Sequence, residues 1–475
     1  MASHYRRFDD LMRLPPGKLT LLTLVLGLIY LLPPPVIAQR RPPNIVVIVT
    51  DDMGYADIGI HGCKDIPTPN IDALARSGIR FTNAYVSGPY CSPTRAGLLT
   101  GRYPQRFGHE FNLDVSEAHR ELGLPVNETT LADRLHAAGY HTAVFGKWHL
   151  GLAERFHPMS RGFDEFFGFL GGQHSYIDTQ AASRNPILDG RTIVDKTNYL
   201  TEAFVDRAVD FIHRQKSRPF FLYLAFNAVH TPLEVTQKYL DRFPNIADEQ
   251  RRKYAAMLSA MDDGIGRTLA ALRVEGLDEN TIVFFLNDNG GPTMVGTTIN
   301  GASNAPLRGS KRQTYEGGIR VVFAIRWKGH LPEKTTYDQP VIQLDVFPSA
   351  LAVAGIKPKP ESHVDGVDLM PFLLGKQKKP PHEALYWRLG NNVAIRKGEW
   401  KLVKTSEQPL RPFDASTLND LSGAELYNLV KDLGEHENLA SKYPEKVREL
   451  ADAWRQWNNT LSKPLWVPGG PTQRR

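Results

Sequence analysis

Short apolar runs alternate along the chain with longer stretches in which apolar side chains recur every three or four positions. The runs are rich in branched and aromatic residues, as buried strands are, and the longer stretches fit amphipathic helices. This alternation predicts an α/β fold with a mainly parallel sheet flanked by helices. Strands are predicted at residues 44–50, 142–145, 219–226, 281–287 and 319–327.

Helices are expected between these strands. We predict them at residues 69–77, 130–138, 200–215 and 248–274. The first two stop at glycines, which commonly end helices. One face of the longest helix carries Met257, Met261, Ile265 and Leu269. Asp262 and Asp263 lie in the same helix and are interpreted as part of a solvated face.

Polar residues follow the carboxyl ends of four predicted strands. They are Asp51-Asp52, Gly146-Lys147-Trp148-His149, Asn227-Ala228-Val229-His230 and Asp288-Asn289-Gly290-Gly291. Parallel α/β sheets bind ligands in the crevice outside these ends, so the four segments are expected to meet at one site. Taken singly, each cluster also fits a turn, a helix cap or a packed histidine. Their shared position at strand ends favours a common functional site.

Length and charge limit the functions to consider. The chain has 475 residues, enough for one large domain with a smaller partner. Its formal net charge is only +6, and no basic run is interleaved with aromatic residues, so nucleic acid is not an expected partner. Its two cysteines, Cys63 and Cys91, are either joined in one disulfide or free.

The N-terminal region is typical of an export signal. An apolar stretch at residues 19–32 follows basic residues and precedes a proline-rich segment that ends in Ala38-Gln39. This pattern predicts a signal peptide over residues 1–38, and the stretch is short for a transmembrane helix. Met12 is an alternative start, and an uncleaved anchor is the alternative interpretation. We expect a secreted or periplasmic protein with no stable membrane insertion after cleavage.

The segment that begins at Cys91 carries the most specific chemistry. It reads Cys91-Ser92-Pro93-Thr94-Arg95-Ala96-Gly97-Leu98-Leu99-Thr100-Gly101-Arg102. Ser92 can cap a helix, Pro93 suits the first turn and Gly101 can end it. Cys91 is therefore expected just before a helix N-terminus, where backbone N–H groups favour an anion. The alternative is a free cysteine packed as a small hydrophobic residue.

Cys-x-Pro-x-Arg followed by Gly-Leu-Leu-Thr-Gly-Arg resembles the signature of type I sulfatases. The resemblance extends over the whole mature chain through the strand-end clusters and through His230-Thr231-Pro232 and Leu307-Arg308-Gly309-Ser310-Lys311. It implies an arylsulfatase-like enzyme with the alkaline-phosphatase-like fold. It also implies a small C-terminal subdomain, an antiparallel sheet with a helix.

These features predict the following organisation. The sulfatase catalytic domain is expected at residues 39–375 and the C-terminal subdomain at residues 376–463. Residues 376–381 are polar and end in proline, as linkers do, and residues 464–475 are expected as a loose tail. Strands of the subdomain are expected at residues 384–388, 393–404 and 425–430.

The resemblance implies an unusual nucleophile and a metal ion. A maturation enzyme would oxidise Cys91 to formylglycine, and one hydroxyl of the aldehyde hydrate would attack the sulfur of a sulfate ester. Asp51, Asp52, Asp288 and Asn289 would bind the ion together with an oxygen of the modified Cys91. These are all hard oxygen ligands, so Ca²⁺ is expected, with Mg²⁺ as the substitute.

Further roles are implied for the basic residues. Lys147 and Lys311 would neutralise the sulfate oxygens, and Arg95 would fix the formylglycine. His230, beside Lys311, would protonate the leaving alcohol, and His149 would deprotonate the remaining hydroxyl of the hydrate.

Two residues depart from the family pattern, and one segment bears on the substrate. Arg312 stands where a glycine usually follows the lysine, and Val322 where a proline is usual; both are expected to affect loop shape and substrate fit. Residues 163–176 resemble the segment that carbohydrate sulfatases place near the sugar. His174 is therefore a candidate substrate contact, and a structural turn is the alternative.

A sulfated polysaccharide or its oligosaccharides is the expected substrate, because the chain is expected to be exported and shows no apolar hairpin suited to lipids. Two other functions stay open. One is a formylglycine-dependent phosphodiesterase or phosphonate hydrolase. The other is a non-catalytic protein that binds sulfated glycans and lacks the oxidised cysteine.

Overall fold

The computed structural model describes residues 41–179, 184–195, 197–357, 363–406 and 419–467. Residues 42–475 form one compact unit, and the predicted division of this unit after residue 375 stays a prediction. The predicted signal peptide lies outside the described residues. Within the described part of the chain, no helix has the length and apolar character needed to cross a membrane. Cys63 and Cys91 are both free, so the disulfide alternative is wrong.

A ten-stranded sheet forms the centre of the unit. Its strands are β1 (Asn44–Thr50), β2 (Ile79–Phe81), β4 (His141–Lys147), β5 (Glu165–Phe169), β6 (Leu188–Asp189), β7 (Thr192–Ile193), β8 (Phe220–Ala225), β9 (Thr281–Asn287), β10 (Phe323–Arg326) and β11 (Thr335–Tyr337). Their order is β11-β2-β10-β9-β1-β8-β4-β5-β6-β7. The central strands β9, β1, β8, β4 and β5 are parallel, which confirms the predicted fold class. A separate pair joins β3 (Ala84–Tyr85) to β12 (Val341–Ile342).

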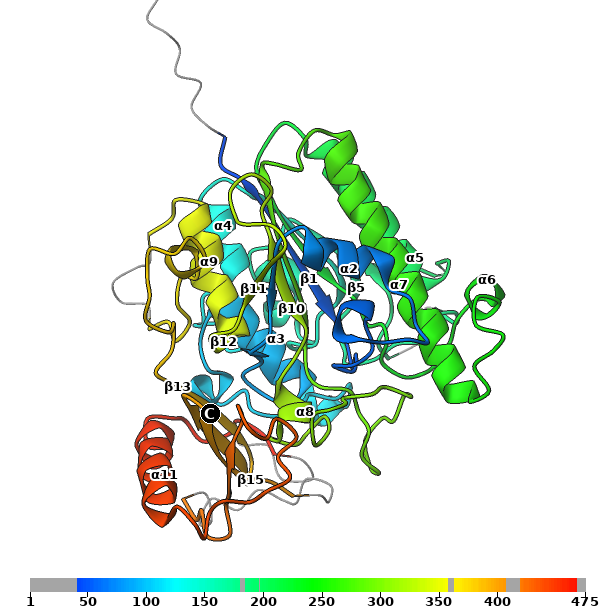
Figure 1. The fold of residues 1–475 in the computed structure, drawn as a ribbon. Coiled ribbons are helices and arrows are strands. Elements are labelled where there is room, and N and C mark those ends of the chain that lie inside the picture. The colour runs from blue at the N-terminus through cyan, green and yellow to red at the C-terminus, as the bar shows by residue number, and fades with distance from the viewer. Residues whose placement is uncertain (1–40, 180–183, 196, 358–362, 407–418, 468–475) are drawn as a thin grey trace, which may run out of the picture. The chain divides into compact units, whose positions relative to one another are not determined.

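Helices cover both faces of the sheet (Figure 1). The α-helices of the described residues are α2 (Pro69–Arg76), α3 (Cys91–Thr100), α4 (Leu131–Ala137), α5 (Leu200–Arg214), α6 (Gln237–Leu240), α7 (Glu249–Val274), α8 (Glu316–Ile319), α9 (Val346–Val353), α10 (Met370–Leu373) and α11 (Pro444–Asn458). In β1, Val46 and Ile48 pack with the layer of α2, α5 and α7, whereas Ile45 and Val47 pack with α3, α4 and α9. Because both faces are buried, this strand reads as a continuous apolar run.

The C-terminal part contains a four-stranded antiparallel sheet, as expected. Its strands are β13 (Ala384–Leu389), β14 (Asn392–Lys397), β15 (Trp400–Lys404) and β16 (Glu425–Asn428), in that order, with α11 packed on β14 and β15. The single strand predicted at residues 393–404 is wrong, because Gly398 has a φ of +61° and turns the chain between β14 and β15. Residues 376–381 connect α10 to β13 without regular structure.

Two further expectations are wrong. Asp262 is buried instead of solvated, because α7 packs against α2 and the carboxylate accepts hydrogen bonds from the backbone N–H groups of Asn70 (3.1 Å) and Ile71 (2.8 Å). It thereby satisfies donors at the start of α2, whereas Asp263 stays at the surface. The loose tail is wrong for residues 464–467, since Trp466 is buried there; residues 468–475 lie outside the described residues.

Candidate active site

The four predicted polar clusters meet at the carboxyl ends of β1, β4, β8 and β9, as the parallel topology requires. Residues of different clusters contact one another through direct ion pairs. Lys147 Nζ lies 2.6 Å from Asp51 Oδ2, and Lys311 Nζ lies 2.8 Å from Asp52 Oδ2. The side chains in both pairs are almost completely buried. The sheet thus brings together acidic and basic residues that are far apart in the sequence.

Arg95 joins α3 to this group. Its Nε and Nη2 atoms donate to Asp288 Oδ2 at 3.1 and 2.9 Å, and Nη1 donates to the carbonyl oxygen of Lys147 at 3.2 Å. A guanidinium held in this way by the ends of β9 and β4 fixes the position of the helix that carries Cys91.

The start of α3 differs from the prediction by two residues. Cys91 is its first residue, with Tyr90 in the N-cap position, so the predicted cap at Ser92 is wrong. The Ser92 hydroxyl instead donates to the carbonyl oxygen of His149 (2.6 Å) and contacts Nε2 of His109 (2.6 Å). Gly101 ends the helix in the left-handed region with a φ of +67°, as expected.

Cys91 is completely buried at the base of the site. Its Sγ atom lies 3.7 Å from Asp51 Oδ1. Burial raises the pKa of the Cys91 thiol to about 12, despite the opposing charges of Lys147 and Lys311. At neutral pH the unmodified side chain is therefore a neutral thiol, which is a poor nucleophile.

The acidic residues fit a metal ion. Ligand atoms of Asp51, Asp52, Cys91 and Asp288 lie within 4.8 Å of one another, and all four residues are buried. Asn289 Oδ1 is buried as well and has no hydrogen-bond partner among the described residues. Burial and the charge of Asp51 raise the pKa of Asp288 to about 6, which reflects carboxylates held close together. Oxygen ligands in this arrangement suit a hard cation.

The charges around Cys91 balance. Three buried carboxylates face three buried basic side chains, Arg95, Lys147 and Lys311. The group is therefore formally neutral, and a divalent cation would make it positive. Such a positive, buried site is suited to an anionic substrate group.

Two histidines stand above this group. His149 Nε2 donates to the carbonyl oxygen of Leu113 at 2.9 Å, so the lone pair of the neutral ring is on Nδ1, which is buried and has no partner among the described residues. His230 Nδ1 donates to the carbonyl oxygen of Thr231 at 2.7 Å, and its Nε2 lies 3.5 Å from Asp52 Oδ2. Burial lowers both pKa values, that of His230 to about 3 with a contribution from Lys311.

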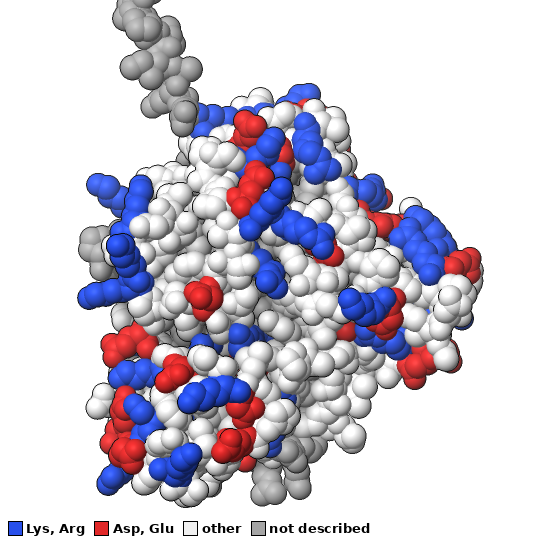
Figure 2. Space-filling model, viewed as in Figure 1, with Lys and Arg blue, Asp and Glu red and all other residues white. Residues whose placement is uncertain are grey.

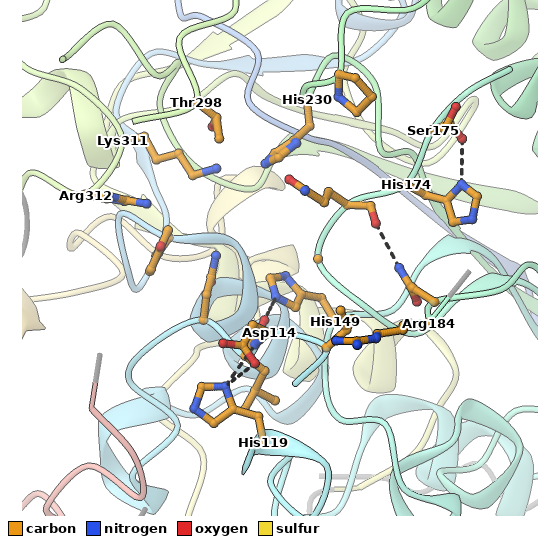
Figure 3. A pocket seen from close by; sticks show the side chains of 18 of the residues that line it. Asp114, His119, His149, His174, Ser175, Arg184, His230, Thr298, Lys311 and Arg312 are labelled. Atoms are coloured by element: carbon orange, nitrogen blue, oxygen red, sulfur yellow. Dashed lines mark hydrogen bonds and ion pairs between the residues drawn. The ribbon is translucent and has the colours of Figure 1, made fainter. Parts of the chain in front are cut away.

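A cavity of about 940 Å³ lies at these residues (Figure 3). His149, His230 and Lys311 line it, and so does His174, whose Nε2 is buried without a partner among the described residues. The sequence did not single out several other lining residues: Asp114, His119, Arg184, Thr298 and Trp466. They lie outside the α-helices and strands, in segments with no motif or periodic pattern, so no signal in a single sequence marks them.

The sequence matches known families over most of its length. A family model described as Sulfatase matches residues 43–356, and one described as N-sulphoglucosamine sulphohydrolase, C-terminal, matches residues 309–458. N-acetylgalactosamine-6-sulfatase of Canis lupus familiaris is 32% identical over 460 residues, which are 89% of this chain and 86% of that protein. Arylsulfatase A of Homo sapiens is 33% identical over 86% of this chain and 85% of that protein.

Solved structures show the same likeness. The crystal structure of Ps i-CgsB is 35% identical, has a TM-score of 0.81 and covers 90% of this chain and 95% of that chain. The structure of a phosphonate monoester hydrolase of Agrobacterium radiobacter is 19% identical with a TM-score of 0.61, covers 88% of this chain and 96% of that chain, and shares the fold alone. The protein described here belongs to the sulfatase family and is a sulfuric ester hydrolase.

Proposed function

We propose that this enzyme removes sulfate from a sulfated polysaccharide or oligosaccharide, through a formylglycine hydrate made from Cys91 and with a bound Ca²⁺. One observation carries the proposal: Cys91 is buried at the first residue of α3, inside a cluster of carboxylates and beside Lys147 and Lys311. A relative that is 32% identical is an N-acetylgalactosamine-6-sulfatase, and Ps i-CgsB has been solved in complex with k-i-k-neocarrahexaose.

The state of Cys91 supports its conversion. A thiol whose pKa is raised to about 12 gives little thiolate at neutral pH, so the sulfur itself is poorly suited to attack. A hydrated aldehyde at the same position supplies a hydroxyl nucleophile and, after sulfate transfer, a second hydroxyl that allows the sulfate to leave. The N-terminal backbone N–H groups of α3 favour the anion beside it. A formylglycine-generating maturation enzyme is the implied partner.

Asp51, Asp52, Asp288 and Asn289, with an oxygen of the modified Cys91, would hold the Ca²⁺, and Mg²⁺ is the substitute. The bound ion would polarise a sulfate oxygen and increase the electrophilicity of sulfur. Without the ion, ion pairs with Lys147, Lys311 and Arg95 hold the three carboxylates in place.

The remaining residues would bind sulfate and move protons. Lys147 and Lys311 are positioned to neutralise sulfate oxygens as charge builds up. His149 carries a free lone pair on Nδ1 and would act as the base on the second hydroxyl. His230 would act as the acid; its low pKa without substrate means that it needs the negative charge of a bound sulfate to favour its protonated form.

The substrate and the location follow from the outer part of the site and from the N-terminus. His174 lines the cavity and would contact the sugar. The signal-like sequence at residues 1–38 supports a secreted or periplasmic enzyme, where sulfated polysaccharides are accessible.

The proposal is tested by expressing the chain with and without a formylglycine-generating enzyme. Peptide mass spectrometry of the Cys91 segment should show conversion only with that enzyme, and sulfate release should follow the converted fraction. Cys91→Ala should fold and release no sulfate, whereas Cys63→Ala, at the other cysteine, should stay active. Active protein with wholly unmodified Cys91 would contradict the mechanism. Faster cleavage of a phosphodiester or phosphonate ester than of the sulfate ester of the same alcohol would favour the alternative enzyme.

A further inference from the structure

Two arginines line the cavity without a carboxylate partner among the described residues. Arg312 donates from Nη1 to the carbonyl oxygen of Gly296 (3.0 Å) and packs 5.2 Å from the ring centre of Tyr90, and its Nε has no partner there. Arg184 is exposed and makes neither a hydrogen bond nor an ion pair within the described ranges. Apart from the Nε of Arg312, which is buried, and the Nη1 group that donates to Gly296, the guanidinium N–H groups of both residues have no partner among the described residues.

The two arginines flank the reacting centre. Figure 3 shows Arg312 beside Lys311 on one side of the cavity and Arg184 on the opposite side, with His149 and His230 between them. At about 940 Å³ the cavity is near the upper end of ligand pockets, which span roughly 300–1,000 Å³. It has room for more than the sulfate that reacts.

Their charge is not needed for the reacting sulfate. The buried group around Cys91 already contains Arg95, Lys147 and Lys311. Two acidic residues also line the cavity, Asp114 and Asp178, and Asp114 is paired with His119 at 2.9 Å. On the face drawn in Figure 2, acidic and basic residues are intermixed. The two arginines therefore add positive charge at the place where the substrate binds.

The backbone at Arg312 indicates that its side chain has a use. Its φ of +76° is in the left-handed region, where glycine is favoured and other residues are strained. The backbone is held there on both sides, since its N–H donates to Pro89 O (2.7 Å) and its carbonyl oxygen accepts from Asn392 Nδ2 (2.9 Å). A glycine would fit this position, so the arginine is held here at a local conformational cost.

We propose that Arg312 and Arg184 bind acidic groups on the sugars at either side of the reacting one. The preferred substrate is then a glycan with negative charge on both sides of the sulfate that is removed. This inference rests on the proposed function. A planar guanidinium pairs in bidentate fashion with sulfate and with carboxylate, so both are acceptable flanking groups.

The test compares four variants on matched substrates: Arg312→Gly, Arg312→Lys, Arg184→Ala and Arg184→Lys. Arg312→Gly keeps the backbone conformation and removes only the side chain. The matched control is Arg267→Ala, an arginine that pairs with Asp206 at the surface. The substrates are one monosulfated monosaccharide and oligosaccharides that contain this sugar between uncharged, sulfated or carboxylated neighbours.

Arg312→Gly and Arg184→Ala should each raise KM about tenfold or more for the charged oligosaccharides, because each removes a charge-assisted contact. Their kcat should change little, and both lysine variants should retain part of the affinity. The monosulfated monosaccharide and the uncharged oligosaccharide should be cleaved as by wild type. A larger effect with sulfated than with carboxylated neighbours, or the reverse, identifies which acid is preferred.

Equal losses on every substrate would overturn the proposal, because the arginines would then act on the reacting sulfate or on the fold. Unchanged KM for the charged oligosaccharides would overturn it as well, and an effect at only one arginine would overturn the two-sided arrangement. These outcomes all require a wild type that releases sulfate. Wild-type protein with converted Cys91 that cleaves none of the sulfate esters would instead contradict the proposed function.

Discussion

His230→Ala should separate proton donation from sulfate binding. The imidazole is fixed by its hydrogen bond to Thr231 O (2.7 Å), and Nε2 points into the site beside Asp52 and Lys311. Activated aryl sulfates release a phenolate that needs no proton, whereas alkyl and sugar sulfates release a strongly basic alkoxide. Loss of a general acid is therefore expected to matter most for the second class.

The magnitudes follow from the two roles. A hydrogen bond from the imidazole to a charged sulfate is worth about 1.5–3 kcal/mol, roughly a 10- to 150-fold loss in kcat/KM on every substrate. General acid catalysis adds about 10²–10⁴-fold for poor leaving groups alone. The variant should thus lose roughly 10³-fold or more on a sugar sulfate and far less on an activated aryl sulfate.

The assay measures kcat/KM for a series of sulfate esters whose leaving-group pKa rises, with wild type and variant side by side. The dependence on leaving-group pKa should be steep for His230→Ala and shallow for wild type. Equal losses across the series would refute acid catalysis and leave His230 with sulfate binding alone. His174→Ala is the matched control, because it removes a cavity histidine that is not placed beside Lys311 and should leave this dependence unchanged.

Three further predictions concern the metal, the C-terminal segment and pH. Chelation should abolish sulfate release, and Ca²⁺ or Mg²⁺ should restore it. Asp288→Ala should lose its bound metal, measured by elemental analysis, together with turnover. Full activity without metal would contradict the ligand assignment. Trp466→Ala should lower the free energy of unfolding by about 3–5 kcal/mol in denaturant titrations, because the buried ring packs 4.7 Å from that of His109; an unchanged midpoint would contradict this. Burial lowers the pKa of His382, but Asp345, 2.8 Å away, raises it by more, so the pKa lies above its ordinary value. The stability advantage of wild type over His382→Gln should therefore be full below about pH 6.5 and should decline as the pH rises above this value. A stability difference that grows with pH would contradict this prediction.

Four of the five parallel core strands could be predicted closely because their physical cause is local to each strand, whereas β5 was missed. The apolar runs at residues 44–50 and 281–287 coincide with β1 and β9, since strands covered by helices on both faces contain few polar positions. Short strands toward one edge of the sheet were missed as well. β2 and β11 have three residues each and take their place from tertiary pairing, and the run at residues 319–327 contains the end of α8 and an irregular segment before β10.

The site could be predicted as a set of residues but not as a set of contacts. Strand ends on one edge of a parallel sheet must meet, which is why Asp51 and Lys147 were expected together. Which carboxylate each lysine pairs with depends on loop paths that have no periodic pattern. The same holds for Ser92, which lies inside α3 and donates a hydrogen bond to His149 O instead of capping the helix, and for Trp466, which reaches the cavity from beyond the last helix.

Backbone strain in this protein is concentrated where the chemistry is expected. Asp52 (φ +58°), His149 (φ +62°) and Arg312 (φ +76°) are three of the five non-glycine residues with positive φ in the described ranges. Each of the three residues either forms a buried ion pair itself or lies within two residues of a lysine that does. The surrounding structure can therefore hold a backbone conformation that the residue alone disfavours. The parallel sheet therefore does more than gather the residues: it holds Asp52, the proposed metal ligand, and His149, the proposed base, in strained conformations before substrate arrives. Arg312 is held instead by its contacts with Pro89 and Asn392.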